Sequence, residues 1–239
     1  MTARKSDLRV LVVQNEGASP PGLISQWLDE QAADVSVLRI DLEERDVDPR
    51  DYQLLVPLGS EFPAYDESRP FVERSRRLLE RAVEADVPVL GVCFGGQLLA
   101  RVLGGQAFRA PESEIGWIPV RTNDPELVSE GPWFQWHFDT FTTPPGATLV
   151  AENEAGAQAF VSGRHLGVQF HPEVTPQIMD EWVRTYRHEL DEEGVDPDAL
   201  LEETDRRAEE SRRSSQRLLK RYLDAVARIC SNDAGARSA

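Results

Sequence analysis

The stretch VPVLGVCFGGQLLA, residues 87–100, decides how we interpret this chain. Its apolar first part, 87–92, predicts a buried strand that runs directly into Cys93 and then into a helical pattern. Small residues at Gly91 and Gly95, two positions on either side of the cysteine, permit the tight strand-to-helix turn that lifts a nucleophile out of a sheet. The N–H groups and dipole of the following helix favour a thiolate. Cys93 is therefore a candidate nucleophile, and a buried structural cysteine is the alternative.

Short apolar strands alternate with helical patterns throughout the first half of the chain. Strands are predicted at 8–13, 35–40, 54–57 and 87–92, and helices at 23–31, 71–85 and from Cys93 to about 102. The strands are nearly continuous in Val and Leu, which is typical of a parallel sheet covered on both faces. We therefore expect an α/β fold with a mostly parallel central sheet flanked by helices.

The spacing of apolar residues changes in the second half of the chain. Short β-rich segments, separated by Gly, Pro, Asn and Asp turns, predict antiparallel or mixed strands at 106–110, 115–121, 134–138, 147–152, 157–162 and 165–170. A helix is expected from Thr175 to Leu190, with Thr175 as its cap and Pro176 at its first position. These strands would extend the parallel sheet.

The C-terminal part of the chain is rich in charge. We divide the sequence into a catalytic domain, 1–190, and a charged helical extension, 191–239. No large apolar residue lies between Glu202 and Arg217, and a helical stripe then follows at Leu218, Leu219, Tyr222, Leu223, Val226 and Ile229. We predict a helical appendage over 195–231 whose distal turn docks on the body or on a partner, and disorder in the last eight residues.

The charge balance excludes several classes of protein. The 42 Asp and Glu against 26 Lys and Arg give a net charge of −16, which repels phosphate backbones and anionic lipids. We therefore expect no nucleic-acid or membrane partner. Two cysteines are too few for a disulfide framework, and neither a signal peptide nor a long apolar run is visible. A soluble, cytoplasmic protein is expected.

A histidine and a carboxylate follow a second strand. The segment LGVQF, 166–170, runs into His171-Pro172-Glu173, so an imidazole and a carboxylate project from the end of that strand. A cysteine nucleophile needs a base, and the base needs a group that orients its other nitrogen. His171 and Glu173 supply both, whereas a lone core or surface histidine is the alternative.

The two motifs together resemble the class I glutamine amidotransferase family, whose members carry G-x-C-x-G-x-Q and a downstream H-P-E. Both are complete here, as GVCFGGQ and HPE, with 171 minus 93, or 78, residues between the cysteine and the histidine. The resemblance covers about residues 7–185. Within the family, the chain most resembles stand-alone members related to the amidotransferase domain of GMP synthetase. The stretches that carry this narrower resemblance are PLGSEFPAYDE (57–67), EIGWIPV (114–120), WHFDTF (136–141), PPGATL (144–149) and GVQFHPEVTP (167–176).

The resemblance implies an α/β fold of flavodoxin-like layers and a Cys-His-Glu triad. Cys93 would attack the side-chain amide of glutamine and form a γ-glutamyl thioester. His171 would act as base and then protonate the departing ammonia, with Glu173 holding its tautomer. The backbone N–H groups of Phe94 and Gly59 would receive the oxyanion.

Further substrate-binding residues are implied around the triad. Gln97 closes the nucleophile motif and would hold the amino-acid end of the substrate. The family often has a second glycine before the position of Ser60, so the oxyanion assignment between Gly59 and Ser60 stays open. His137 and Asp139 occupy the place of a His-Gly-Asp loop in related domains, which predicts a contact with substrate or acceptor. A hairpin with an Asp turn and an exposed histidine is the alternative.

No cofactor or metal is expected. Ligands drawn from His137, Asp139 and His171 match no closed zinc pattern. The sequence lacks a G-x-x-x-x-G-K-[ST] loop, and no acceptor domain fits after residue 185. Three hypotheses follow. The first is an enzyme that hydrolyses glutamine or a related γ-glutamyl amide and releases ammonia to solution or to a partner synthetase. The others are a γ-glutamyl hydrolase of the peptidase type and a regulatory or binding subunit that depends on a partner. A homo-oligomer is left open.

Overall fold

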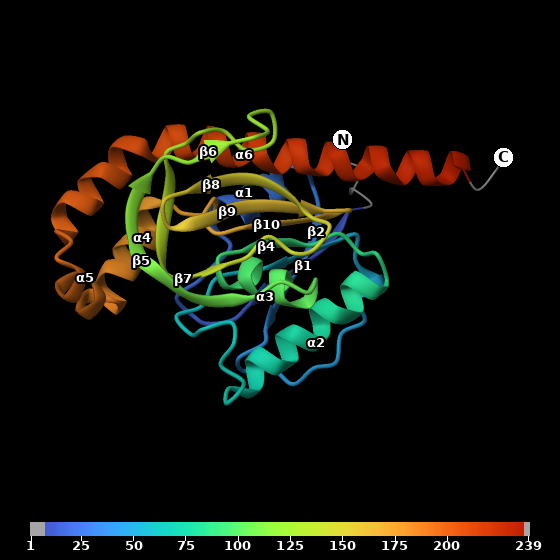
Figure 1. Ribbon diagram of the computed structural model, residues 1–239, viewed down its shortest axis with the longest axis horizontal. Coiled ribbons are helices and arrows are strands. Elements are labelled where there is room, and N and C mark those ends of the chain that lie inside the picture. Colours follow the sequence, from blue (N-terminus) through green and yellow to red (C-terminus); the bar gives the residue numbers. More distant parts are fainter. Residues whose placement is uncertain (1–7, 237–239) are drawn as a thin grey trace.

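The computed structural model describes residues 8–236, and within 227–236 it describes only the backbone. Five parallel strands form one half of a central sheet (Figure 1). In sheet order they are β2 (Asp34–Arg39), β1 (Arg9–Gln14), β3 (Leu54–Pro57), β4 (Leu90–Val92) and β10 (His165–Val168). A parallel bridge between Leu55 and Val89 joins β3 to β4. The predicted parallel half is confirmed.

Alternate side chains of the strands enter two hydrophobic layers. Val10 and Val12 of β1 pack with α1 (Gly22–Glu30) and α6 (Pro197–Ala236). Leu11 and Val13 point to the other face of the sheet and pack with α2 (Pro70–Glu84) and α3 (Phe94–Val102), because successive side chains in a strand alternate. The sheet therefore lies between two helical layers, as Figure 1 shows.

The second half of the chain adds antiparallel strands. Strands β9 (Gly156–Ser162), β8 (Thr148–Asn153) and β6 (Arg121–Thr122) continue the sheet beyond β10, and β5 (Ala107–Ile118) pairs with β7 (Trp133–Phe141). The two strands predicted at 106–110 and 115–121 are largely one strand, β5. Its register against β7 shifts between Arg109 and Glu114, a stretch that includes Pro111, which has no backbone N–H to donate.

The helix predicted over 175–190 is two helices, α4 (Pro176–Thr185) and α5 (Arg187–Glu193). The Thr175 hydroxyl accepts from the N–H of Ile178 at 3.2 Å, which confirms the predicted cap. The break falls at Tyr186, which has φ −108° and ψ 28°. Its buried ring lies 5.9 Å from that of Trp136, so tertiary packing accompanies the interruption.

Helix α6 lies along the body for most of its length. Where the sequence offers no large apolar residue, small side chains are buried instead: Thr204, Ser211 and Ser215. Leu218, Leu219 and Tyr222 then enter the same core cluster as α1 and β1. The helix continues to Ala236, beyond the predicted end at 231 and into the stretch predicted to be disordered, whereas 237–239 lie outside the described residues. The domain boundary at 190 stays a prediction.

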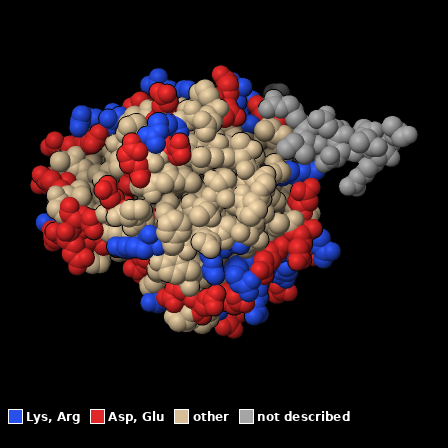
Figure 2. All heavy atoms as spheres, in the orientation of Figure 1, with Lys and Arg blue, Asp and Glu red and all other residues tan. Residues whose placement is uncertain are grey.

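Charged side chains gather at the rim of the face seen in Figure 2, with acidic residues and arginines interleaved. Glu73 of α2 pairs with Arg76 at 2.8 Å and Arg77 at 2.6 Å, and Glu209 of α6 pairs with Arg212 at 2.8 Å. These pairs join residues one turn apart on the surface of each helix. Within residues 8–236, every helix is too short or too polar to cross a membrane.

Candidate active site

Cys93 stands at the sharp turn between β4 and α3. Its backbone has φ 49° and ψ −110°, a positive φ that a residue with a side chain rarely adopts. Its N–H donates to the carbonyl of Val168 at 2.9 Å, and its carbonyl accepts from the N–H of Gln97 at 2.9 Å. Such strain persists only where the surrounding structure fixes it, and it is commonly found at active sites.

The glycines around Cys93 are required by close backbone contacts. A Cβ at Gly91 would lie 2.5 Å from the carbonyl oxygen of Gly95, and one at Gly95 would lie 2.1 Å from that of Pro57. A Cβ at Gly96 would lie 2.5 Å from the carbonyl oxygen of Val168. The glycines of GVCFGGQ are therefore required because no side chain would fit at their positions in this turn.

His171 and Glu173 follow β10. Nδ1 of His171 lies 2.7 Å from Oε1 of Glu173, and both side chains are buried. The backbone N–H of His171 donates to the carbonyl of Phe134 at 2.8 Å, and its ring meets Trp182 edge to face at 4.8 Å. Nε2 of His171 is buried and has no hydrogen-bond partner among the described residues. This nitrogen is therefore available to a reacting group.

The surroundings of His171 favour its charged form. Burial alone would lower the pKa of His171, but the charge of Glu173 and the neighbouring Cys93 outweigh burial, so the pKa lies well above its ordinary value. A histidine with a raised pKa stays protonated at neutral pH. The geometry accordingly places a protonated imidazole beside the Cys93 sulfur.

Gly59 lies beside both the nucleophile and the base. A Cβ placed there would be 3.2 Å from Cε1 of His171 and 3.9 Å from Cβ of Cys93. The buried side chain of Asn15 donates to the carbonyl of Leu58 at 2.8 Å and so holds this loop. Phe94 is the first residue of α3, directly after the nucleophile. Their assignment to an oxyanion hole fits these positions and stays a prediction.

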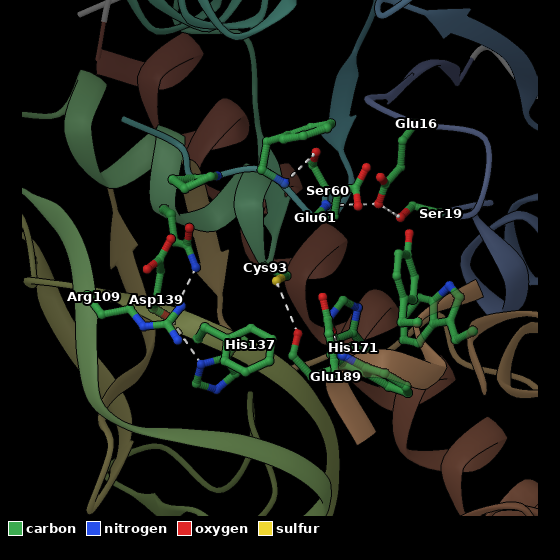
Figure 3. A pocket seen from close by; sticks show the side chains of 17 residues that line it. Glu16, Ser19, Ser60, Glu61, Cys93, Arg109, His137, Asp139, His171 and Glu189 are labelled. Atoms are coloured by element: carbon green, nitrogen blue, oxygen red, sulfur yellow. Dashed lines mark hydrogen bonds between the residues drawn. The ribbon is translucent and has the colours of Figure 1, made fainter. Parts of the chain in front are cut away.

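A cavity of about 100 Å³ opens in front of Cys93 (Figure 3). Both Ser60 and Gln97 line it, and their predicted contacts with substrate stay predictions. The Ser60 hydroxyl accepts from the N–H of Phe62 at 3.3 Å. In Figure 3, Arg109 and Asp139 lie on one side of Cys93, which we call the arginine end. Glu16 and Glu61 lie on the other side, and Glu189 lies below Cys93 near His171; we call these three carboxylates the acidic end.

The arginine end is built by β5 and β7, whose register places Arg109 opposite Asp139. Oδ1 of Asp139 accepts from the Tyr65 hydroxyl at 3.1 Å, and the Asp139 carbonyl accepts from Nε2 of Gln97 at 3.2 Å. Burial raises the pKa of Asp139, although Tyr65 and Arg109 act against it. The Arg109 guanidinium lies 4.7 Å from the ring centre of Phe138. This end thus carries both signs of charge.

The acidic end combines residues from three distant segments. Oε1 of Glu16 accepts from the Ser19 hydroxyl at 2.8 Å and from the N–H of Glu61 at 3.0 Å. Oε2 of Glu189 accepts from Nε1 of Trp136 at 2.6 Å. Burial raises the pKa of Glu16 and also that of Glu189. Glu16, Arg109 and Glu189 lie in none of the motifs named above. Glu61 lies within PLGSEFPAYDE (57–67), but only the tertiary fold brings it to the other two carboxylates.

His137 belongs to a buried polar network, not to an exposed hairpin. Its Nδ1 lies 3.0 Å from the carbonyl oxygen of Asp139 and its Nε2 lies 2.9 Å from Oε2 of Glu114. Glu114 also accepts from Gln158 at 2.8 Å and from Asn153 at 2.6 Å. Because both ring nitrogens are engaged, a substrate contact by His137 fits less well than one by Asp139. Within the described residues, no group of three His, Cys, Asp or Glu could hold a metal ion.

Comparisons with known proteins agree with this geometry. The family model for class I glutamine amidotransferases matches residues 12–185. The glutamine-hydrolysing GMP synthase of Thermus thermophilus is 34% identical over 180 residues, which cover 71% of this chain and 35% of the relative, so the match spans about a third of that protein. A glutamine-hydrolysing GMP synthase subunit of Sulfurisphaera tokodaii is 33% identical over 135 residues, covering 52% of this chain and 69% of the relative.

Two solved structures match most of the chain. A glutamine amidotransferase of Thermotoga maritima has 33% identity and a TM-score of 0.82, covering 91% of this chain and 99% of its own. A glutamine amidotransferase of Methylobacillus flagellatus has 28% identity and a TM-score of 0.83, covering 92% and 95%. The likeness therefore includes the C-terminal region as well as the part matched by the family model.

Proposed function

This chain belongs to the class I glutamine amidotransferase family, and we propose that it hydrolyses the γ-amide of glutamine through a thioester on Cys93. The observation that carries the proposal is the strained Cys93 in one cavity with His171, whose other ring nitrogen pairs with Glu173. A nucleophile, a base with a free nitrogen and an orienting carboxylate are the parts that acyl transfer requires.

The first chemical step is attack by the Cys93 thiolate on the amide carbon. A carbon–sulfur bond forms, and the carbonyl electrons move to oxygen to give a tetrahedral oxyanion. The N–H of Phe94 and the loop at Gly59 are the candidates to receive this charge, since both adjoin Cys93. Stabilisation by such donors acts on the transition state because the charge develops only there.

The second step releases ammonia. Nε2 of His171 donates its proton to the amide nitrogen as the carbon–nitrogen bond breaks, and Glu173 stabilises the imidazolium before the transfer. His171 then takes a proton from water, which attacks the thioester. Glutamate leaves and the thiolate is restored.

The arginine end suits the amino-acid half of glutamine. The Arg109 guanidinium offers a counter-charge to the α-carboxylate, and the Asp139 carboxylate offers one to the α-ammonium. The buried side chain of Gln97 hydrogen-bonds to both Asp139 and Gln169, and so holds the cavity lining between the arginine end and Cys93 in place. We expect glutamine to be oriented with its backbone at this end and its amide at the sulfur.

The acceptor of the ammonia is a separate question. One relative is named as a subunit of a GMP synthase, which supports a partner synthetase for this chain as well. A partner site on the stripe of α6 is less well supported, because Leu218, Leu219 and Tyr222 are buried against the body. Hydrolysis of a larger γ-glutamyl amide is the remaining alternative, and the acidic end favours it.

Steady-state glutaminase assays test the proposal. Purified wild-type protein is expected to release glutamate from glutamine, and Cys93→Ala is expected to lose this activity. Glu84→Gln, at the last residue of α2, is the control and should retain it. Equal rates in wild type and Cys93→Ala would contradict the proposal.

A further inference from the structure

We propose that this site takes γ-glutamyl amides whose leaving amine carries a second positive charge, as in a diamine joined through one of its nitrogens. The inference deepens the proposed function and rests on it, because it concerns the same cavity and the same thioester. It starts from the unequal charges at the two ends of that cavity.

The direction of the substrate follows from the position of the base. His171 must protonate the leaving nitrogen, so the leaving amine lies on the His171 side of Cys93. A Cβ at Gly59 would lie 3.2 Å from Cε1 of His171 and 3.8 Å from Oγ of Ser19, whose hydroxyl donates to Glu16. The base therefore adjoins the acidic end. The leaving amine departs toward Glu16, and the glutamyl half occupies the arginine end.

A buried atom without a partner marks the place of the leaving nitrogen. His171 is 4% exposed, lines the cavity, and its Nε2 has no hydrogen-bond partner within the described part of the chain. Cys93 is the neighbour of this ring, so a leaving nitrogen on the carbon that Cys93 attacks lies within reach of Nε2. Beyond it the cavity continues to Glu189, Glu16 and Glu61 (Figure 3).

The acidic end is more negative than ammonia release requires. Of the described cavity-lining residues, Arg109 is the one Lys or Arg, and it lies at the opposite end. The raised pKa values of Glu16 and Glu189 follow chiefly from burial, which costs free energy that a bound cation would offset. Neutral ammonia needs no cluster of carboxylates. Arg39 acts on Glu16 from outside the cavity, and an alkylammonium group carried on the leaving amine would supply the positive charge that no described lining residue provides at this end.

The reaction balances without a further reactant. The Cys93 sulfur bonds to the γ-carbonyl carbon, the carbon–nitrogen bond breaks, and the proton from His171 goes to the leaving nitrogen. Water then cleaves the thioester. The products are glutamate and the free diamine, and nothing is oxidised or reduced.

The test compares two substrates of equal length. In γ-glutamyl-1,4-diaminobutane the leaving amine ends in an ammonium, and in γ-glutamyl-pentylamine a methyl group takes its place. We expect wild-type kcat/KM to favour the diamine conjugate by roughly tenfold or more, the scale of one charged contact. The ratio of the two values is the readout, because loss of folded protein lowers both equally.

Charge-neutralising variants locate the effect. Glu16→Gln and Glu189→Gln keep a carbonyl oxygen that can accept the existing hydrogen bonds from Ser19 and Trp136, and Glu61→Gln removes a charge at an exposed position. Each of the three is expected to move the ratio toward one. Glu61 is exposed, so its substitution is the one least able to disturb folding. Glu84→Gln carries the same charge change on α2 and should leave the ratio unchanged. Arg109→Gln should lower kcat/KM for both conjugates equally.

The outcomes separate this inference from the function on which it rests. A wild-type ratio near one, or a ratio that none of the three glutamate variants changes, overturns the diamine assignment while glutamine is still hydrolysed. A ratio that falls in Arg109→Gln instead reverses the orientation and also overturns it. Loss of all turnover, with no chemical labelling of Cys93, would contradict the proposed function itself.

Discussion

Cys93 shows how much a single residue depends on its neighbours. Its positive φ is held by main-chain hydrogen bonds to Val168 and Gln97, and the glycines beside it leave no space for side chains. Most of these constraints lie within a few residues of the motif. For this reason the turn and the place of Cys93 in it could be predicted from the sequence alone.

Gly95→Ala is expected to destabilise the protein. Its Cβ would lie 2.1 Å from the carbonyl oxygen of Pro57, so the strand or the helix must shift. We expect a loss of roughly 1–3 kcal/mol in the free energy of unfolding, as for other overpacked positions, measured by urea denaturation. Gly17→Ala is the matched control, because its nearest neighbour is an Arg39 guanidinium nitrogen at 3.6 Å. Equal stability of both variants would contradict the steric account.

Glu173→Gln is expected to change the pH dependence of catalysis. The Glu173 charge helps to hold the pKa of His171 above its ordinary value, so its removal lowers that pKa. The imidazolium then deprotonates at lower pH, and the alkaline limb of the kcat/KM profile moves to lower pH. We also expect kcat/KM to fall by about 10²-fold or more. An unmoved alkaline limb would show that Glu173 does not control His171, whereas Glu84→Gln should match the wild type.

For helices and strands, features set by neighbouring residues could be predicted from the sequence, and features set by tertiary packing could not. The cap at Thr175 was predictable because it depends on residues three positions apart. The break at Tyr186 was not, since it coincides with packing on Trp136, which lies fifty residues earlier. Likewise α6 buries Ser211 and Ser215, whose polarity had suggested a solvated face. Periodicity predicts which segments are helical, but not which small polar residues a neighbouring helix covers.

Thr175→Ala should weaken the start of α4. The variant removes the hydroxyl that accepts from the N–H of Ile178. A loss of about 1 kcal/mol is expected in urea denaturation. Thr175→Ser keeps the hydroxyl and is the control. If the alanine and serine variants were equally stable, the cap would not contribute as described.

Tyr222→Phe should weaken the attachment of α6. The Tyr222 hydroxyl lies 3.0 Å from the carbonyl oxygen of Val89 and 2.7 Å from that of Arg164, within a buried environment. Its loss leaves buried acceptors without this donor, and we expect a cost of roughly 1–3 kcal/mol in thermal or urea unfolding. Tyr52→Phe, at a partly buried position outside α6, serves as the control. No loss in Tyr222→Phe would argue against a firmly docked helix.

At the scale of the whole molecule, the cavity is assembled from segments that the sequence separates widely. The meeting of Cys93 with the His171–Glu173 pair was predictable because they follow neighbouring parallel strands, whose carboxyl ends meet at one edge of the sheet. Glu16, Arg109 and Glu189 come from three further segments, and no spacing rule links them. The net charge of −16 could not predict the acidic end, because a total charge does not say where on the molecule the carboxylates gather.

The central claim is that Cys93 carries the acyl group, and covalent labelling tests it most directly. A diazo-ketone analogue of glutamine should inactivate the wild-type protein, glutamine should protect against it, and peptide mass spectrometry should find the label on Cys93. Cys93→Ser should remain unlabelled under the same conditions, while Glu84→Gln should be labelled like the wild type. A wild-type protein that stays unlabelled, or is labelled elsewhere, would contradict the account.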